Sequence, residues 1–172
     1  ERLPRSERGL VEGAYHEQVT GDLDAAVRAY QATLEIEAGN ITALDNLAAL
    51  YIRERRYAEA DGLLDRCTMA PIPIASCYYR RLRVVYALEG EEAARQAVHE
   101  ADALFPASVM IAFQRVWLEG AAGHYERADS LLAALQARMG GSARALAVFQ
   151  SVAADLRSTR RPTIVFAHQG LL

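Results

Sequence analysis

The sequence predicts an all-α protein built from repeated helical hairpins. A small residue returns every 34 residues, at Ala26, Ala60, Ala94 and Ala128. Around these positions, apolar residues follow the i, i+3, i+4, i+7 spacing of amphipathic helices. In segment 41–70, two such helices are separated only by the polar residues Arg53 to Arg56. Two short helices joined so tightly form an antiparallel hairpin, which must stack on similar hairpins to bury its apolar faces.

Two further rows share this period and lie in the first helix of each hairpin. One comprises Ala14, Ala48, Leu82 and Val116, and the other, one turn earlier, comprises Leu10, Leu44, Tyr78 and Ala112. Four in-phase copies predict a single domain over 1–172 with units at about 7–40, 41–74, 75–108 and 109–142. A terminal helix at about 143–157 continues the phase. The irregular tail at 158–172 has no repeat register.

Capping and turn residues delimit the helices of the first half. Ser6 is expected to cap a helix that runs to about Val19, and Gly21-Asp22 makes the turn that follows. The partner helix starts at Leu23 and should end at Gly39-Asn40, because glycine is favoured just past a helix. The second unit contributes the two helices on either side of Arg53 to Arg56.

Proline and glycine delimit the helices of the second half. Pro71 and Pro73 stop the second unit and impose an extended link. The third unit is expected to turn at Glu89-Gly90 and to run from Glu91 to about Phe105. In the fourth unit we expect helices at 108–119 and 125–139, ended by Gly140-Gly141.

Composition and charge bound the partners and the compartment. The net charge of −3, with both signs interspersed, does not favour nucleic acid or an anionic membrane. All 19 basic residues are arginine, and together with abundant alanine this indicates a GC-rich, bacterial coding sequence. Cys67 and Cys77 are the two cysteines; because Pro71-Ile72-Pro73 lies between them, we expect no disulfide and a reducing, cytoplasmic location. The chain begins at Glu1 rather than methionine, so we expect a fragment without its native N-terminus.

The repeat resembles the tetratricopeptide repeat (TPR) family. The second unit carries the fullest pattern, with Leu44, Leu47-Ala48, Tyr51, Tyr57, Ala60 and Leu64. The turn of the family pattern is matched by Gly21 to Ala26 and by Gly123 to Ala128, whereas the third unit has Arg81 where leucine is expected. The resemblance covers roughly residues 7–157. It implies a right-handed α-solenoid of antiparallel hairpins whose first helices line a concave surface.

The resemblance also implies which residues face this concave surface. They are mainly aromatic residues and arginines, a composition typical of binding hot spots. The expected binding residues are Tyr15, Asn46, Arg53, Tyr79, Arg80, Arg83, Tyr86, Phe113 and Trp117. Alternatively, single aromatics pack against the next unit and single arginines are solvated surface charges. A complete clamp for a terminal carboxylate is not expected, because lysine is absent and Val11 and Asp45 stand at two of its positions.

The sequence shows no catalytic or metal-binding motif. The histidines, His16, His99, His124 and His168, lie in separate elements without metal-ligand spacing. Gly120 to Gly123 connects two helices, unlike a phosphate-binding loop. Cys67 occupies a packing position, where a thiol is usually inert. We therefore expect no enzymatic activity and no cofactor.

The sequence favours a non-catalytic protein–protein interaction scaffold that binds a peptide or partner domain in the concave aromatic and arginine groove. A second hypothesis is self-assembly into a homo-oligomer through the terminal helix or the tail. A third is an RNA-binding helical repeat, against which the acidic net charge of −3 argues. We expect neither nucleic acid nor a membrane among the partners.

Overall fold

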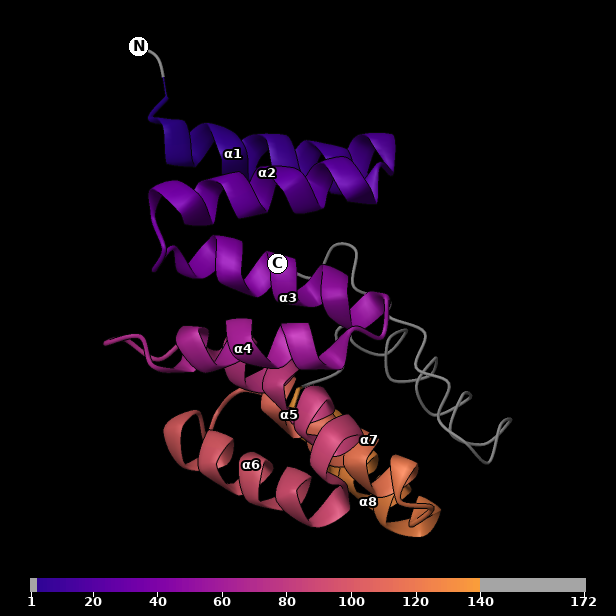
Figure 1. Ribbon diagram of the computed structural model, residues 1–172. Coiled ribbons are helices and arrows are strands. Elements are labelled where there is room, and N and C mark those ends of the chain that lie inside the picture. Colours follow the sequence, from indigo (N-terminus) through magenta and orange to yellow (C-terminus); the bar gives the residue numbers. More distant parts are fainter. Residues whose placement is uncertain (1–2, 140–172) are drawn as a thin grey trace. The chain divides into compact units, whose positions relative to one another are not determined.

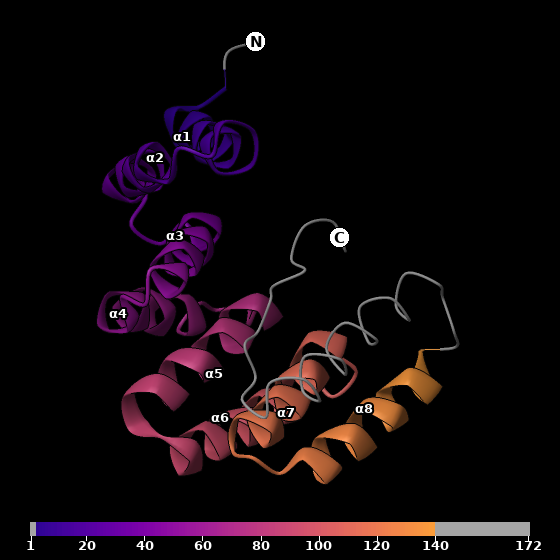
Figure 2. The ribbon, with the colours of Figure 1, turned by 90° about the vertical axis from the view of Figure 1, so that its right-hand side faces the viewer.

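The computed structural model describes residues 3–139 and contains no strand within them. The helices are α1 (Arg5–Tyr15), the π-helix η1 (His16–Thr20), α2 (Leu23–Ile36), α3 (Ile41–Arg53), α4 (Tyr57–Thr68), α5 (Ala75–Glu89), α6 (Glu91–Leu104), α7 (Val109–Ala121) and α8 (Tyr125–Arg138). Figures 1 and 2 show them as successive coiled segments joined by short turns. The expected helix at 143–157 and the tail at 158–172 lie outside the described residues.

The chain divides into two compact units, Glu1–Ala97 and Val98–Leu172, and the boundary falls within α6. In the first unit, α1 pairs with α2 and α3 pairs with α4 as antiparallel hairpins (Figure 1). The second helix of each hairpin packs on the first helix of the next, so that α2 contacts α3 and α4 contacts α5. Helices α3 and α5 also contact one another directly. This arrangement of the first unit is the stacked-hairpin arrangement that the 34-residue period predicts.

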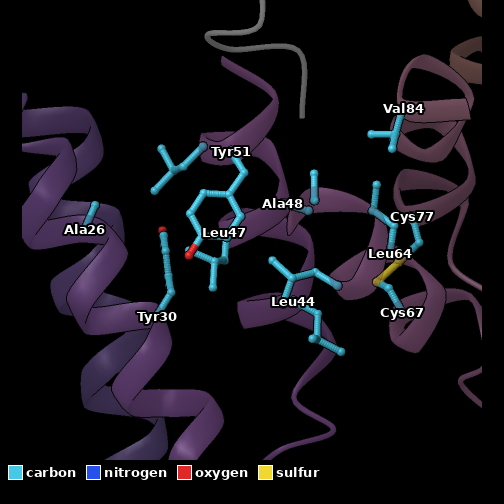
Figure 3. Close-up of a cluster of buried hydrophobic side chains, with 13 residues drawn as sticks. Ala26, Tyr30, Leu44, Leu47, Ala48, Tyr51, Leu64, Cys67, Cys77 and Val84 are labelled. Atoms are coloured by element: carbon cyan, nitrogen blue, oxygen red, sulfur yellow. A yellow bond between two sulfur atoms is a disulfide. The ribbon is translucent and has the colours of Figure 1, made fainter. Parts of the chain in front are cut away.

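The recurring alanines are confirmed as close-packing positions. Ala26, Ala60, Ala94 and Ala128 are each 0% exposed, and each lies in the second helix of its hairpin. In the first unit, Ala60 belongs to the same apolar cluster as Ala26, Leu44, Ala48 and Leu64. Figure 3 labels the last four of these residues. A methyl group at these positions lets neighbouring helices approach closely, and the larger residues one turn away fill the remaining space.

The first and second hairpins fill the space between their two helices with side chains of different sizes. In the second hairpin, Leu47 of α3 and Leu64 of α4 are both buried in the core. Thirty-four residues earlier, the equivalent positions hold Gly13 and Tyr30, both of which are buried. A Cβ atom on Gly13 would lie 2.7 Å from Cζ of the Tyr30 ring. Glycine in α1 therefore provides the space that the tyrosine ring of α2 occupies.

Three of the connections carry side-chain caps, whereas the start of the first helix does not. Asp22 Oδ1 accepts a hydrogen bond from the Ala25 amide at 2.9 Å, Asn40 Oδ1 from that of Ala43 at 3.0 Å, and Ser108 Oγ from that of Ile111 at 3.4 Å. The prediction that Ser6 caps the first helix is wrong. Helix α1 begins at Arg5, so Ser6 lies inside its first turn, and the N-cap residue Pro4 makes no side-chain cap hydrogen bond.

The end of the first helix also differs from the expectation of a regular helix to Val19. The α-helical part ends at Tyr15, and the chain continues as the π-helix η1 to Thr20. Gly21 then takes a left-handed conformation with φ of 72°. Within η1, the carboxylate of Glu17 accepts a hydrogen bond from the Tyr30 hydroxyl at 3.4 Å. Apolar periodicity alone does not distinguish an α-turn from a π-turn over five residues.

Arg55 is strained at a position that the first and fourth repeats give to glycine, Gly21 and Gly123. Its φ is 60°, and it lies 34 residues after Gly21 and 34 residues before Glu89, whose neighbour Gly90 takes φ of 93°. The left-handed conformation places Cβ of an L-residue close to the backbone. Because Arg55 is exposed, its side chain contributes little packing that would offset this strain.

We expect Arg55→Gly to raise the free energy of unfolding by about 0.5–1 kcal/mol, because relief of strain exceeds the added flexibility of the unfolded chain. Urea denaturation monitored by circular dichroism measures the change. Ala58→Gly, in the exposed first turn of α4, is the control and should lower stability by up to about 1 kcal/mol. A loss of stability in Arg55→Gly would contradict the assignment of strain to this residue.

The two cysteines form a disulfide, so the prediction of separate thiols is wrong. Cys67 at the end of α4 is bonded to Cys77 in the first turn of α5, with the Cα atoms 5.8 Å apart (Figure 3). The segment with Pro71 and Pro73 reverses the chain, so that α5 returns to α4 instead of leading away from it. Tyr78 spans the same reversal by donating its hydroxyl to the Thr68 carbonyl at 3.4 Å. Because disulfides are rare in reducing compartments, the argument for a cytoplasmic location loses its basis.

In the second unit, α7 and α8 form a hairpin with its own apolar cluster. Val116 of α7 packs with Ala128, Leu132 and Leu135 of α8. At the turn, the buried carboxylate of Glu119 lies 3.0 Å from His124 Nδ1 and 3.6 Å from Arg127. Arg115 pairs with Asp102 of α6 at 3.0 Å. Across residues 3–139, none of the helices has the length and apolar character needed to cross a membrane.

Candidate functional site

An ion pair joins the first helices of two successive hairpins in the first unit. Nε of Arg80 in α5 donates to Oδ1 of Asp45 in α3 at 2.8 Å, and both side chains are only 13% exposed. The two residues are 35 positions apart, so they come from nearly equivalent places in successive repeats. The pair fixes α5 against α3 on the side where the sequence predicts binding residues.

Next along α5, Arg83 lies among aromatic hydroxyl groups. Burial lowers the pKa of Arg83 to about 10, and the charge of Arg80 acts in the same direction. Tyr79 and Tyr57 oppose this shift, because their oxygens favour the charged guanidinium. Arg83 is therefore a partly desolvated cation flanked by tyrosines. Tyr57 is a residue of the repeat pattern and not one of the expected binding residues, and the structure adds it to this group.

Elsewhere in the first unit, two expected site residues, Asn46 and Arg53, belong to a polar network with Tyr30 and Glu17. Burial, followed by the charge of Glu17, raises the pKa of the Tyr30 hydroxyl to about 12, while a hydrogen bond from Asn46 opposes the shift. Glu17 also pairs with Arg53 at 3.6 Å. Tyr15 is 52% exposed and contacts the edge of the His16 ring. Asn46 therefore has a structural partner, whereas Tyr15 and half of the Arg53 side chain remain open to solvent.

Within the second unit, Phe113 and Trp117 lie one turn apart on α7, and both are half-buried. Phe113 packs against the cluster of Val116, Ala128 and Leu132. Phe113 therefore packs within its own hairpin, whereas the alternative interpretation of the groove aromatics has them pack against the next unit. Tyr86 is half-buried near the end of α5 in the first unit.

Comparison with known proteins identifies the fold. No protein-family model and no curated protein sequence matches the chain. Among solved structures, a TPR protein from Parabacteroides merdae superposes with a TM-score of 0.73 at 20% identity, covering 88% of this chain and 57% of its own. The chain has the fold of tetratricopeptide repeat proteins. MamA gives a TM-score of 0.63 at 20% identity, covering 91% of this chain and 84% of MamA.

A further TPR structure, YrrB, superposes with a TM-score of 0.58 at 20% identity and covers 88% of this chain and 77% of YrrB. YrrB is described as a TPR protein with an unusual peptide-binding site. The expected all-α helical repeat solenoid is therefore confirmed. The present chain spans just over half the length of the Parabacteroides protein.

The TPR register explains why the expected binding residues fall at only a few positions of the first helices. Tyr15, Ala49, Arg83 and Trp117 are separated by 34 residues each and occupy one repeat position. Val11, Asp45, Tyr79 and Phe113 occupy a second position, one turn earlier. In the first unit, the structure brings Tyr79, Arg80 and Arg83 together on α5, with Tyr57 of α4 close to Arg83. We call Tyr57, Tyr79, Arg80 and Arg83 the tyrosine–arginine cluster.

The described residues also contain one group that could ligate a metal ion. The carboxylate of Asp45 and the sulfur atoms of Cys67 and Cys77 lie within 4.8 Å of one another. Sequence reasoning missed this group because it placed the two cysteines apart. The only signal that pointed to it was the approach of successive first helices, which brings α3 alongside α5.

Proposed function

We propose that this TPR-fold chain is a non-catalytic interaction module that binds an extended peptide segment, or a partner domain presenting one, along the first helices. The tyrosine–arginine cluster supplies the main contacts in the first unit, together with Tyr15, Arg53 and Tyr86. Phe113 and Trp117 supply aromatic contacts in the second unit. The unusual peptide-binding site described for YrrB supports a ligand of this class on the same fold.

The observation that carries the proposal is the partly desolvated Arg83 beside Tyr79 and Tyr57. A guanidinium interacts more strongly with a carboxylate where water is partly excluded, because the effective dielectric constant is lower. Tyrosine rings add apolar contact area at low entropic cost. We therefore expect the preferred ligand to carry an acidic side chain or a terminal carboxylate next to apolar residues.

A direct test begins with peptides selected from a random phage-displayed library on the wild-type chain. Labelled synthetic copies are then titrated by fluorescence polarisation against Arg83→Ala, Tyr79→Ala and the double variant Tyr79→Ala/Arg83→Ala. Each single change should weaken binding about tenfold or more, and the double variant about a hundredfold or more. Circular dichroism should show unchanged helicity.

Arg28→Ala is the matched control, because Arg28 is an exposed arginine on α2, a second helix. It should leave the affinity within about twofold, since isolated exposed charges contribute little. If the selected peptides bound all variants with wild-type affinity, the first-helix face would not be the binding surface. The self-assembly hypothesis depends on residues 143–172, outside the described residues, and stays a prediction from the sequence.

A further inference from the structure

Three potential metal ligands from three helices meet beside the tyrosine–arginine cluster. Asp45 comes from α3, Cys67 from the end of α4 and Cys77 from the start of α5. Both cysteines are 0% exposed, and Asp45 is largely buried against Arg80. Their ligating atoms all lie within 4.8 Å of one another. We propose that, when the disulfide is reduced, Cys67, Cys77 and Asp45 bind a thiophilic divalent cation of the Zn²⁺ class.

The geometry requires only small side-chain movements. In a tetrahedral zinc site with Zn–S bonds of about 2.3 Å, neighbouring ligand atoms lie about 3.8 Å apart. The Asp45 oxygen already lies within 4.8 Å of both sulfur atoms. The sulfur atoms must separate from their bonded position, which rotation about the two Cα–Cβ bonds permits. A water molecule from the exposed loop containing Met69 and Ile72 would complete four-coordination.

The local charge favours occupancy by a divalent cation. Two thiolates and one carboxylate carry a charge of −3, the cation contributes +2 and Arg80 contributes +1, so that the group is neutral. A buried set of charges is tolerated when it is balanced and hydrogen-bonded. Arg80 holds one oxygen of Asp45 at 2.8 Å. In the metal-bound state, this contact orients the carboxylate, as hydrogen bonds to metal ligands commonly do.

The disulfide and the metal-bound form are two states of the same cysteines. A dithiol reductant attacks the disulfide, and after a second exchange it leaves as a cyclic disulfide while the chain gains two thiols. The cation then displaces two protons, one from each thiol. Each state links the end of α4 to the start of α5. Metal binding at this site does not rest on the peptide-binding function proposed above, although Arg80 belongs to both groups.

The test uses Co²⁺ as a spectroscopic probe on the whole chain. Wild-type protein reduced with a phosphine and freed of reductant should bind one Co²⁺, with a near-ultraviolet thiolate-to-cobalt band and visible bands of tetrahedral cobalt. Added Zn²⁺ should displace it and abolish these bands. Oxidised wild-type protein should show none of them, because the disulfide removes both thiolates. The absence of thiolate bands in the reduced wild-type protein would overturn the proposal.

Variants assign the ligands. Cys67→Ser and Cys77→Ser should abolish the thiolate bands or reduce them to a weaker one-sulfur form, and Asp45→Asn should weaken Co²⁺ binding about tenfold or more. Asp61→Asn is the control, because Asp61 is a partly buried aspartate on α4 outside the group, and it should bind as the wild type does. Wild-type affinity in Asp45→Asn would show that Asp45 is not a ligand and would overturn the three-residue site.

A second measurement does not depend on the folding of the variants. In reduced wild-type protein, Zn²⁺ should protect both Cys67 and Cys77 from alkylation. Intact-mass spectrometry should then find two fewer alkyl groups per chain in the presence of Zn²⁺ than in its absence. Alkylation of both cysteines at the same rate with and without Zn²⁺ would contradict the proposal. Protection that a chelator reverses would support it, since a merely buried thiol stays protected when the metal is removed.

Discussion

Gly13→Leu is expected to lower the free energy of unfolding by about 3 kcal/mol or more. Even a single carbon on Gly13 would overlap the Tyr30 ring, lying 2.7 Å from its Cζ atom, and the Tyr30 side chain is 0% exposed. The better helix propensity of leucine returns only about 1 kcal/mol. Urea denaturation monitored by circular dichroism and by tyrosine fluorescence measures the loss.

The second hairpin supplies the compensating change. Its equivalent pair is Leu47 and Leu64, both buried. Tyr30→Leu alone should leave a cavity and lower stability by about 1–3 kcal/mol. The double variant Gly13→Leu/Tyr30→Leu should recover most of the loss caused by Gly13→Leu. If the two changes were additive, the helices of the first hairpin would not share this space.

This pair illustrates how much of the fold the sequence predicts. The 34-residue rows are sufficient to predict the hairpins, their order and the buried alanines. A small residue that recurs at a fixed spacing indicates a position where two helices pack closely together. The exchange of Gly13 and Tyr30 for Leu47 and Leu64 is also visible in the aligned rows. It is interpretable only when both helices are considered together, because neither residue alone departs from an amphipathic pattern.

The disulfide could not be derived from the same rows. Whether Cys67 meets Cys77 depends on the path of the connection with Pro71 and Pro73, and the periodicity of the helices does not determine that path. The predicted extended link would have separated the cysteines. The observed reversal places the first turn of α5 against the last turn of α4.

The candidate site is predicted as a set of residue types, whereas their environments come from tertiary packing. Arg80, Arg81 and Arg83 are near neighbours in the sequence, yet each has a different environment. Arg80 pairs with Asp45 in a largely buried contact, and Arg81 pairs with Asp65 at 2.9 Å on the surface. Arg83 is desolvated among tyrosines. These arginines lie only one to three residues apart on α5. Their different burial therefore depends on which neighbouring helix each side chain faces.

Asp45→Ala is expected to lower the free energy of unfolding of the oxidised chain by about 3 kcal/mol, because it leaves the Arg80 guanidinium largely buried without its carboxylate. Asp65→Ala is a matched control. Asp65 also pairs with an arginine of α5, Arg81, at a similar distance of 2.9 Å, but the two side chains are 43% and 35% exposed, against 13% for both members of the buried pair. Its loss should cost less than about 1 kcal/mol.

The two variants together separate burial from charge pairing, since both remove an aspartate that bridges to α5. Chemical denaturation at low and high salt extends the comparison, because an exposed pair is screened by salt and a buried pair is screened much less. Equal losses in the two variants would indicate that Arg80 relaxes to solvent when Asp45 is removed. In that case the Asp45–Arg80 pair would not hold α5 in register, and Tyr79 and Arg83 would need another anchor to face the same side.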